Sequence, residues 1–254
     1  MTEKLRILVV DDDRRLASTL VDILRVKGHQ AEAAYSGPEA QDTLKQEQFD
    51  CVLSDIRIPE MSGVELQRAI REAQPQTPVL LMTAYSSDRL VQEALEEGAI
   101  ATLTKPLDIN NLLCFLSSLR QQQSVVIVDD DPAFCQTLGD ILGARGFAVT
   151  KLTDPSGVAE SLDSDELAVL LDMKLNSIGG LEILKEIRGR CPRVPVILVT
   201  GYRQEMSAAI QAALEIGAYA CLYKPFEIDE LLQSLADLRN RNLSRILRRL
   251  MAKG

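Results

Sequence analysis

The chain has 254 residues, 46% of them hydrophobic and 26% charged, which are values typical of a globular protein. Its net charge of −9 disfavours non-specific nucleic-acid binding by the body of the chain, and no stretch approaches the roughly 20 apolar residues that span a membrane. Five Cys without CxxC spacing, and an N-terminus without a signal-peptide cleavage site, predict a cytoplasmic protein with reduced thiols.

The first half of the chain alternates short apolar runs with amphipathic segments. Strands are predicted near residues 5–10, 30–34, 51–54, 78–82 and 100–103, and helices near 14–27, 37–46, 63–73, 86–97 and 108–121. Asp13 is a candidate N-cap of the first helix, and Gly28 is its expected stop. Such alternation predicts a parallel sheet that helices cover on both faces.

The second half repeats this order, with strands near 125–128, 147–151, 167–171, 195–199 and 219–222 and helices between and after them. Five strands and five helices per copy predict a doubly wound, open α/β sheet in each half. The expected domains are residues 1–122 and 123–240, followed by a basic amphipathic tail, 241–254. The junction at 120–124 lacks a Gly/Pro-rich spacer, so the two domains are expected to lie close together.

One constellation of polar residues occurs in both halves, at the ends of equivalent apolar runs. The first copy is Asp11, Asp12, Asp55, Thr83 and Lys105, and the second is Asp129, Asp130, Asp172, Thr200 and Lys224. Equivalent positions are 117 to 119 residues apart, which indicates an internal duplication. Because parallel strands present their carboxyl ends at one sheet edge, each set is expected to converge there.

Three converging carboxylates repel one another and favour a bound cation, and hard oxygen ligands in this number suit Mg²⁺. A nearby Lys can contact phosphate oxygens, and a Thr hydroxyl can hydrogen-bond one of them. Together these groups can form an aspartyl phosphate, with the Asp as nucleophile.

The first copy resembles the receiver domain of two-component response regulators. The resemblance rests on Val-Val-Asp-Asp-Asp at 9–13, Ser-Asp-Ile-Arg-Ile-Pro-Glu-Met-Ser-Gly at 54–63, Met-Thr-Ala at 82–84 and Thr-Lys-Pro at 104–106. It implies two flavodoxin-like, doubly wound α/β domains, each with strand order 2-1-3-4-5. It also implies that Asp55 accepts a phosphoryl group from a partner's phosphohistidine. Asp12, Asp55 and the backbone carbonyl of Arg57 would ligate Mg²⁺, and Asp11 would act mainly through water. Lys105 would contact the phosphoryl group, and Thr83 would swing towards it.

The same resemblance assigns Asp129 and Asp130 to the second acidic pair, Asp172 to its acceptor, Lys174 to its carbonyl ligand, and Thr200 and Lys224 to its switch. Asn176 replaces a proline of the first copy, and the loop after Thr200 is two residues longer, which affects the output surface more than the chemistry. The position of the usual switch aromatic holds Thr102 or Cys221. Tyr85 and Tyr202 are hypothesised to shield the acyl phosphate from water.

One helical face of the tail is apolar and lies among several arginines; its residues are Leu243, Ile246, Leu247, Leu250 and Met251. Three interpretations stay open: a solvated extension of the last helix, a dimer seam or effector connector, and, less favoured, a helix on an anionic surface or nucleic acid. The single His29 is expected to be structural, so the phosphoryl donor must be another molecule.

The sequence therefore predicts a tandem-receiver protein of a phosphorelay, whose partner is a sensor histidine kinase or a histidine phosphotransfer protein. It is not expected to be an enzyme acting on an external substrate, and no specific nucleic acid or output domain is expected. One rival is a phosphatase of the haloacid-dehalogenase kind, which needs an Asp-x-Asp on its first strand. The other rivals are a second receiver that only docks, and a regulatory part of a larger signalling protein.

Overall fold

The computed structural model describes residues 4–74, 77–84, 89–96, 99–121, 123–163, 166–175, 179–201 and 207–251. The chain divides into two compact units. One comprises Met1–Leu119 together with Asn240–Gly254, and the other comprises Arg120–Arg239. The end of the chain thus belongs to the same unit as its beginning.

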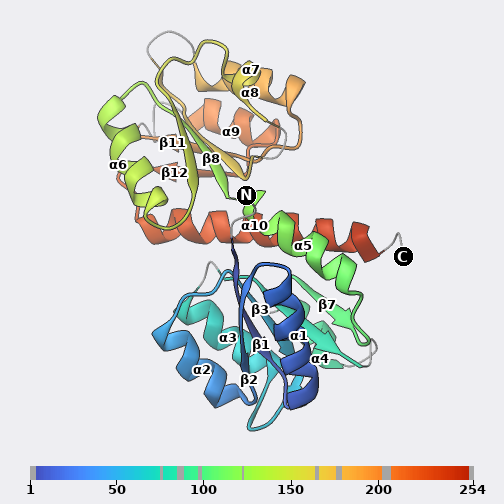
Figure 1. Ribbon diagram of the computed structural model, residues 1–254. Helices are drawn as coiled ribbons and strands as arrows, with labels where there is room; N and C mark the ends of the chain where they lie inside the picture. The colour runs from blue at the N-terminus through green and yellow to red at the C-terminus, as the bar shows by residue number, and fades with distance from the viewer. Residues whose placement is uncertain are drawn as a thin grey trace. The chain divides into compact units, whose positions relative to one another are not determined.

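The first unit is built on a five-stranded parallel sheet in the order β2-β1-β3-β6-β7 (Figure 1), which confirms the predicted topology. The strands are β1 (Arg6–Val10), β2 (Gln30–Ala34), β3 (Cys51–Asp55), β6 (Val79–Thr83) and β7 (Ala101–Thr104). The helices are α1 (Arg14–Val26), α2 (Gly37–Gln46), α3 (Gly63–Ala73), α4 (Arg89–Glu96) and α5 (Ile109–Gln121). A short antiparallel hairpin of β4 (Arg57–Ile58) and β5 (Met61–Ser62), with two residues in each strand, was not predicted.

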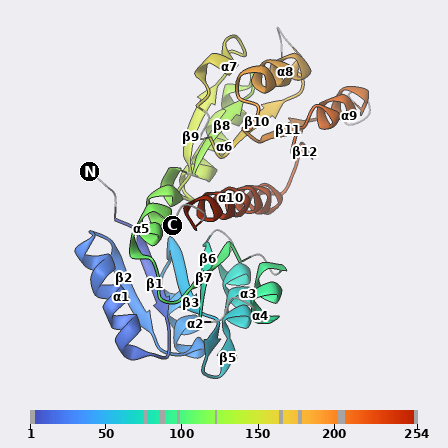
Figure 2. The same cartoon turned by 90° about the vertical axis from the view of Figure 1, so that its right-hand side faces the viewer.

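Alternation along each strand sends side chains to opposite faces of this sheet, and each face has its own core. Ile7 and Val9 of β1 join a cluster with α1 and α5, whereas Leu8 and Val10 join a cluster with α2, α3 and α4. Figure 2 shows α1 and α5 on one side of the sheet and α3 and α4 on the other. This two-sided burial explains why the strands read as continuous apolar runs.

Local signals fix the ends of several helices, at Asp13 and Gly28 as predicted. The Asp13 carboxylate caps α1 by accepting from the backbone amides of Arg15 and Leu16. Gly28 follows α1 with a φ of 93°, a conformation that glycine adopts without strain. Asp131 caps the equivalent helix of the second unit, which begins at Pro132.

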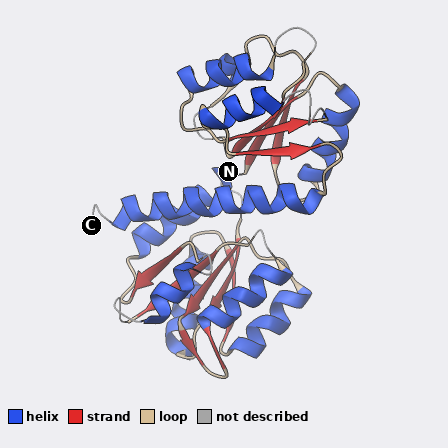
Figure 3. Cartoon of the chain, turned by 180° about the vertical axis from the view of Figure 1, so that it is seen from behind, coloured by secondary structure: helices blue, strands red, loops and turns tan. Residues whose placement is uncertain are grey.

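The second unit repeats the architecture with sheet order β12-β11-β10-β8-β9, again flanked by helices on both faces (Figure 3). Its strands are β8 (Ser124–Val128), β9 (Ala148–Leu152), β10 (Ala168–Asp172), β11 (Val196–Thr200) and β12 (Ala220–Tyr223). Its helices are α6 (Pro132–Gly143), α7 (Val158–Ser161), α8 (Gly180–Arg190), α9 (Ser207–Glu215) and α10 (Ile228–Met251). The short α7 has no side-chain cap, since its N-cap is Gly157.

Helix α10 has 24 residues against 13 in α5, its counterpart in the first unit. Leu231, Leu235 and Leu238 near its start belong to the core of the second unit. The remainder, residues 240–251, belongs to the first unit and is called the C-terminal arm below. Leu243 and Leu247 of the arm are 0% exposed, so the interpretation as a solvated extension is wrong for its apolar face.

Candidate metal centres

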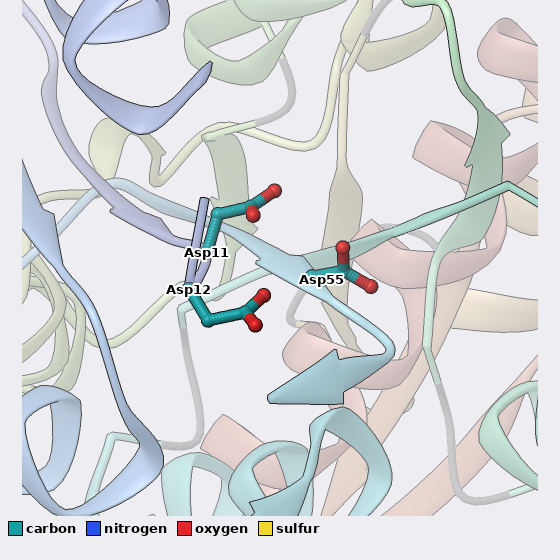
Figure 4. A group of neighbouring side chains, drawn as sticks. All are labelled: Asp11, Asp12 and Asp55. Carbon is teal, nitrogen blue, oxygen red and sulfur yellow. The ribbon is translucent and has the colours of Figure 1, made fainter. Parts of the chain in front are cut away.

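Two neighbouring parallel strands bring the aspartates of the first unit together. Val10 of β1 pairs with Ser54 of β3. Asp11 comes directly after Val10 and Asp55 directly after Ser54, so both lie at the carboxyl edge of the sheet. Figure 4 shows the carboxylates of Asp11, Asp12 and Asp55 gathered at this edge. One ligand atom from each residue lies within 4.8 Å of the other two. The predicted convergence of the three carboxylates is present in the structure.

A lysine ammonium joins two of these carboxylates. Lys105 follows directly after β7, and its Nζ donates to Oδ2 of Asp11 at 2.7 Å and also to Oδ2 of Asp55. Burial by itself lowers the pKa of Lys105, but the hydrogen bonds to the two carboxylates outweigh it, so the pKa is raised. The ammonium is therefore held charged beside the predicted acceptor.

Backbone amides orient the same two carboxylates from the other side. The N–H of Asp13 donates to Oδ1 of Asp11, and the N–H of Arg57 donates to Oδ1 of Asp55, both at 3.0 Å. The Arg57 side chain is exposed, and the contact to Asp55 comes from the Arg57 backbone. This agrees with a role for residue 57 that does not depend on its side chain.

Burial gives the first site its electrostatic character. Asp11 is 0% exposed, and this burial raises its pKa, although the hydrogen bond from Lys105 opposes the shift. Asp12 is exposed and Asp55 is half-buried. Three carboxylates this close together repel one another and favour a bound cation, and their hard oxygen donors suit Mg²⁺. The residues therefore fit a magnesium ion.

The second unit reproduces this arrangement. Ligand atoms of Asp129, Asp130 and Asp172 lie within 4.8 Å of one another. Lys224 Nζ donates to Oδ2 of Asp129 at 2.5 Å and to Oδ2 of Asp172 at 2.9 Å. Burial raises the pKa of Asp129, and the pKa of Lys224 is raised because its hydrogen bonds outweigh its burial.

The backbone contacts of the second site match those of the first as well. The N–H of Asp131 donates to Oδ1 of Asp129 at 2.9 Å, and the N–H of Lys174 donates to Oδ1 of Asp172 at 3.0 Å. The Lys174 side chain is exposed. The change from Arg57 to Lys174 between copies therefore leaves the contact to the acceptor intact.

One difference between the copies involves an aromatic ring that sequence reasoning did not single out. Lys224 Nζ lies 4.0 Å from the ring centroid of Phe134, where the first copy has Leu16. Phe134 also makes an edge-on contact with Phe226, at 6.4 Å between centroids. Such a cation–π contact contributes about 0.5–2 kcal/mol and holds the ammonium from a third direction.

The two threonines occupy equivalent places at the ends of β6 and β11. Thr83 is 1% exposed and Thr200 is 0% exposed. The carbonyl oxygen of each accepts from the backbone N–H of the lysine, Lys105 at 2.7 Å and Lys224 at 2.8 Å. The backbone thus ties each threonine to the lysine of the same site, while the predicted movement of the hydroxyls stays a prediction. Tyr85, Tyr202 and Asn176 lie outside the described residues.

Two glycines, for which sequence reasoning proposed no separate role, pack tightly against the acceptors. A Cβ on Gly63 would lie 2.5 Å from the backbone oxygen of Asp55, and one on Gly180 would lie 2.5 Å from that of Asp172. Both glycines lie eight residues after the acceptor, and this repeated spacing was the available signal. The start of α3, like that of α8, can approach the acceptor strand only because no side chain intervenes.

We expect Gly63→Ala to destabilise the protein by about 1–3 kcal/mol, because the added methyl meets rigid backbone rather than a flexible side chain. Chemical denaturation of the purified chain measures this change. Gly189→Ala is the matched control, since Gly189 lies exposed in α8 with nothing within 4 Å, and it should stabilise by up to about 1 kcal/mol. Equal effects of the two substitutions would contradict the close-packing argument.

Within the described residues, no helix is both long and apolar enough to cross a membrane. This agrees with the absence of a suitable apolar stretch in the sequence.

Comparison with known proteins identifies both halves of the chain. The family model for the response regulator receiver domain matches residues 7–116 and again residues 125–236. The two matches together cover most of the chain and include all ten residues of the repeated constellation.

Two sequence relatives agree with this match. A protein of Anaeromyxobacter sp. (strain Fw109-5), described as a response regulator receiver protein, is 30% identical over 92% of this chain and 94% of its own length. The transcriptional regulatory protein ZraR of Klebsiella oxytoca is 37% identical over 63% of this chain, but over only 39% of its own length. The solved chemotaxis response regulator CheY4 of Vibrio cholerae is 30% identical over 46% of this chain and 99% of its own, with a TM-score of 0.43.

Proposed function

The chain belongs to the response regulator receiver family, with one receiver domain in each half, and on this premise we propose that it accepts phosphoryl groups at both Asp55 and Asp172. Receiver domains are phosphoacceptors of histidine kinases rather than enzymes that act on an external substrate. One observation carries the proposal. In the first unit, the ammonium of Lys105 bridges the carboxylates of Asp55 and Asp11. In the second unit, the ammonium of Lys224 bridges those of Asp172 and Asp129.

The proposed reaction is a phosphoryl transfer from a partner's phosphohistidine. A carboxylate oxygen of Asp55 attacks the phosphorus, the P–N bond breaks, and its electron pair returns to the imidazole nitrogen, which takes a proton from water. The product is a mixed anhydride on Asp55. Such transfers need positioning and charge stabilisation more than covalent chemistry. Arg57 N–H orients the acceptor from one side, and Lys105 lies ready to contact the phosphoryl oxygens from the other.

We assign Asp12, Asp55 and the carbonyl of Arg57 as direct magnesium ligands, with Asp11 acting through water. Asp130, Asp172 and Lys174 are their counterparts, and Asp129 corresponds to Asp11. When bound, Mg²⁺ neutralises charge on the transferring oxygens. Three carboxylates with ligand atoms within 4.8 Å support this assignment in each unit.

The hydroxyls of Thr83 and Thr200 are proposed to bond the phosphoryl group and relay its presence. Each threonine ends a central strand and is tied through its carbonyl to the lysine of its site. A change at the acceptor would thereby alter the surface formed by the neighbouring edge strand and helices, and with it the binding of partners. The same chemistry would let the chain promote hydrolysis of its own acyl phosphate.

The geometry favours two working sites over one active receiver and one docking module. Both acceptors have the same lysine contact, the same backbone N–H contact and the same acidic neighbours. We also propose residues 1–122 and 123–240 as the limits of the two receiver domains, with 241–254 as a tail.

Incubation with acetyl phosphate and Mg²⁺ tests the proposal. We expect two phosphoryl adducts per chain by intact mass, and none when EDTA removes the metal, because the carboxylates then repel the incoming phosphate. Parallel incubation with p-nitrophenyl phosphate should give no steady turnover. Steady turnover without a protein adduct would instead support the phosphatase rival.

A further inference from the structure

The C-terminal arm is an unusual part of the first unit, because it follows a whole second domain in the chain. Leu243 and Leu247, four residues apart on one helical face, are 0% exposed. They share one core cluster with Ile100 and Leu103 beside and within β7, and with Leu112, Phe115 and Leu116 of α5. Leu250 packs against the same cluster. Figure 1 shows the end of α10 running alongside α5.

A polar contact fixes the position of the arm along this surface. The hydroxyl of Ser244 donates to the backbone oxygen of Ile100, the residue before edge strand β7. Arg241, Arg245 and Arg248 lie on the exposed side of the same helix. We call the apolar surface formed by five residues of this cluster the β7–α5 face: Ile100, Leu103, Leu112, Phe115 and Leu116. This face is thus a docking site for an amphipathic helix. In this chain its occupant is the arm.

The strand beneath the arm also carries the lysine of the first site. Leu103, in the cluster with the arm, is two residues from Lys105, whose Nζ contacts Asp55 and Asp11. A phosphoryl group on Asp55 would give Lys105 a new partner and shift the end of β7. Packed interiors respond to such shifts by changing between discrete arrangements rather than by yielding gradually. In the structure, Leu243 and Leu247 pack in this cluster while Lys105 contacts the carboxylate of Asp55.

We infer that the arm is a regulatory element that docks on the β7–α5 face when Asp55 is unphosphorylated and is released when Asp55 is phosphorylated. Release would uncover an apolar face suited to a partner's amphipathic helix. This inference rests on the proposed function. Coupling between two sites is reciprocal, so weakening the arm's docking must also favour the phosphorylated state, with typical couplings of about 5- to 150-fold.

Hydrogen–deuterium exchange of the full chain tests the release directly. Amides of 240–251 should lose protection by about 5-fold or more after acetyl phosphate and Mg²⁺ treatment. They should keep their protection in Asp55→Asn, where Asp172 alone can react. Intact mass of the same samples reports the phosphoryl count. Unchanged or increased protection in chains that carry the Asp55 adduct would overturn the inference. Absence of the adduct would overturn the proposed function, and the inference with it.

Variants test the reciprocal effect. The double change Leu243→Asp with Leu247→Asp should raise the occupancy of Asp55 relative to Asp172 in the same molecule by about 5-fold or more, whereas exposed Arg248→Asp should not. Because the double change could unfold the first unit, Ser244→Ala provides a milder test. Loss of one hydrogen bond should reduce the arm's protection in the unphosphorylated chain by about 2- to 10-fold. No effect of Ser244→Ala on protection, together with an unchanged ratio in the double variant, would refute the coupling.

Discussion

Asp55→Asn is expected to leave the chain with one phosphoryl adduct after acetyl phosphate treatment, and Asp172→Asn should do the same. The double variant should carry none. An amide oxygen is a far weaker nucleophile than a carboxylate, so the introduced Asn should not form the anhydride. Each Asn keeps nearly the shape of Asp and can still accept from the N–H of Arg57 or Lys174. Intact mass and peptide mapping count the adducts and locate them.

The two single variants serve as controls for each other, because each retains one unaltered site. Asp42→Asn is a further control, since Asp42 is an exposed residue paired with Lys45 and lies outside both constellations. Retention of both adducts in Asp172→Asn would show that the second unit is a scaffold. Retention in Asp55→Asn would refute the assignment of the first acceptor.

Lys105→Ala is expected to slow phosphoryl acceptance at Asp55 by about 10²- to 10³-fold, the usual consequence of removing one preorganised group that stabilises charge in a transition state. The reason is geometric: the ammonium already contacts Asp55 and is held beside it by Asp11. The rate of adduct formation at Asp55, measured by mass at a fixed concentration of donor, gives the effect. Asp172 in the same chain provides an internal reference.

Lys45→Ala is the matched control, because it removes an exposed lysine that is paired at the surface of α2. This variant should change the rate of adduct formation neither at Asp55 nor at Asp172. Since Lys105→Ala also leaves Asp11 buried without its ammonium partner, circular dichroism must show that the variant is folded before its rate is interpreted. A folded Lys105→Ala chain that reacts at the normal rate would exclude the proposed role of the lysine.

Sequence reasoning predicted the parts of the structure that depend on local pattern and on strand ends. Period-2 and period-3.6 patterning predicted the strands and helices along the chain, and the carboxyl-edge argument predicted that Asp11, Asp12 and Asp55 lie together. Asp13 and Gly28 were recognisable because capping and left-handed turns have few suitable residues.

Features that depend on contacts between distant residues were not predictable in this way. The β4–β5 hairpin has two residues per strand, too few to show any alternation. The contact of Phe134 with Lys224 joins residues 90 positions apart, and nothing in either segment marks it. Several interpretations of the arm stayed open, because an amphipathic pattern indicates that a helix packs against some surface but does not identify that surface.

The placement of the arm has a consequence for how the protein is made. Leu243 and Leu247 complete a core whose other members begin at Leu5, yet they are synthesised only after the whole second domain. Domains of nascent chains generally fold from the N-terminus onward during translation. The first domain of this chain must instead emerge with the β7–α5 face bare, and it stays so until synthesis of the second domain is finished. That interval is when a nascent-chain chaperone would have an apolar surface to hold.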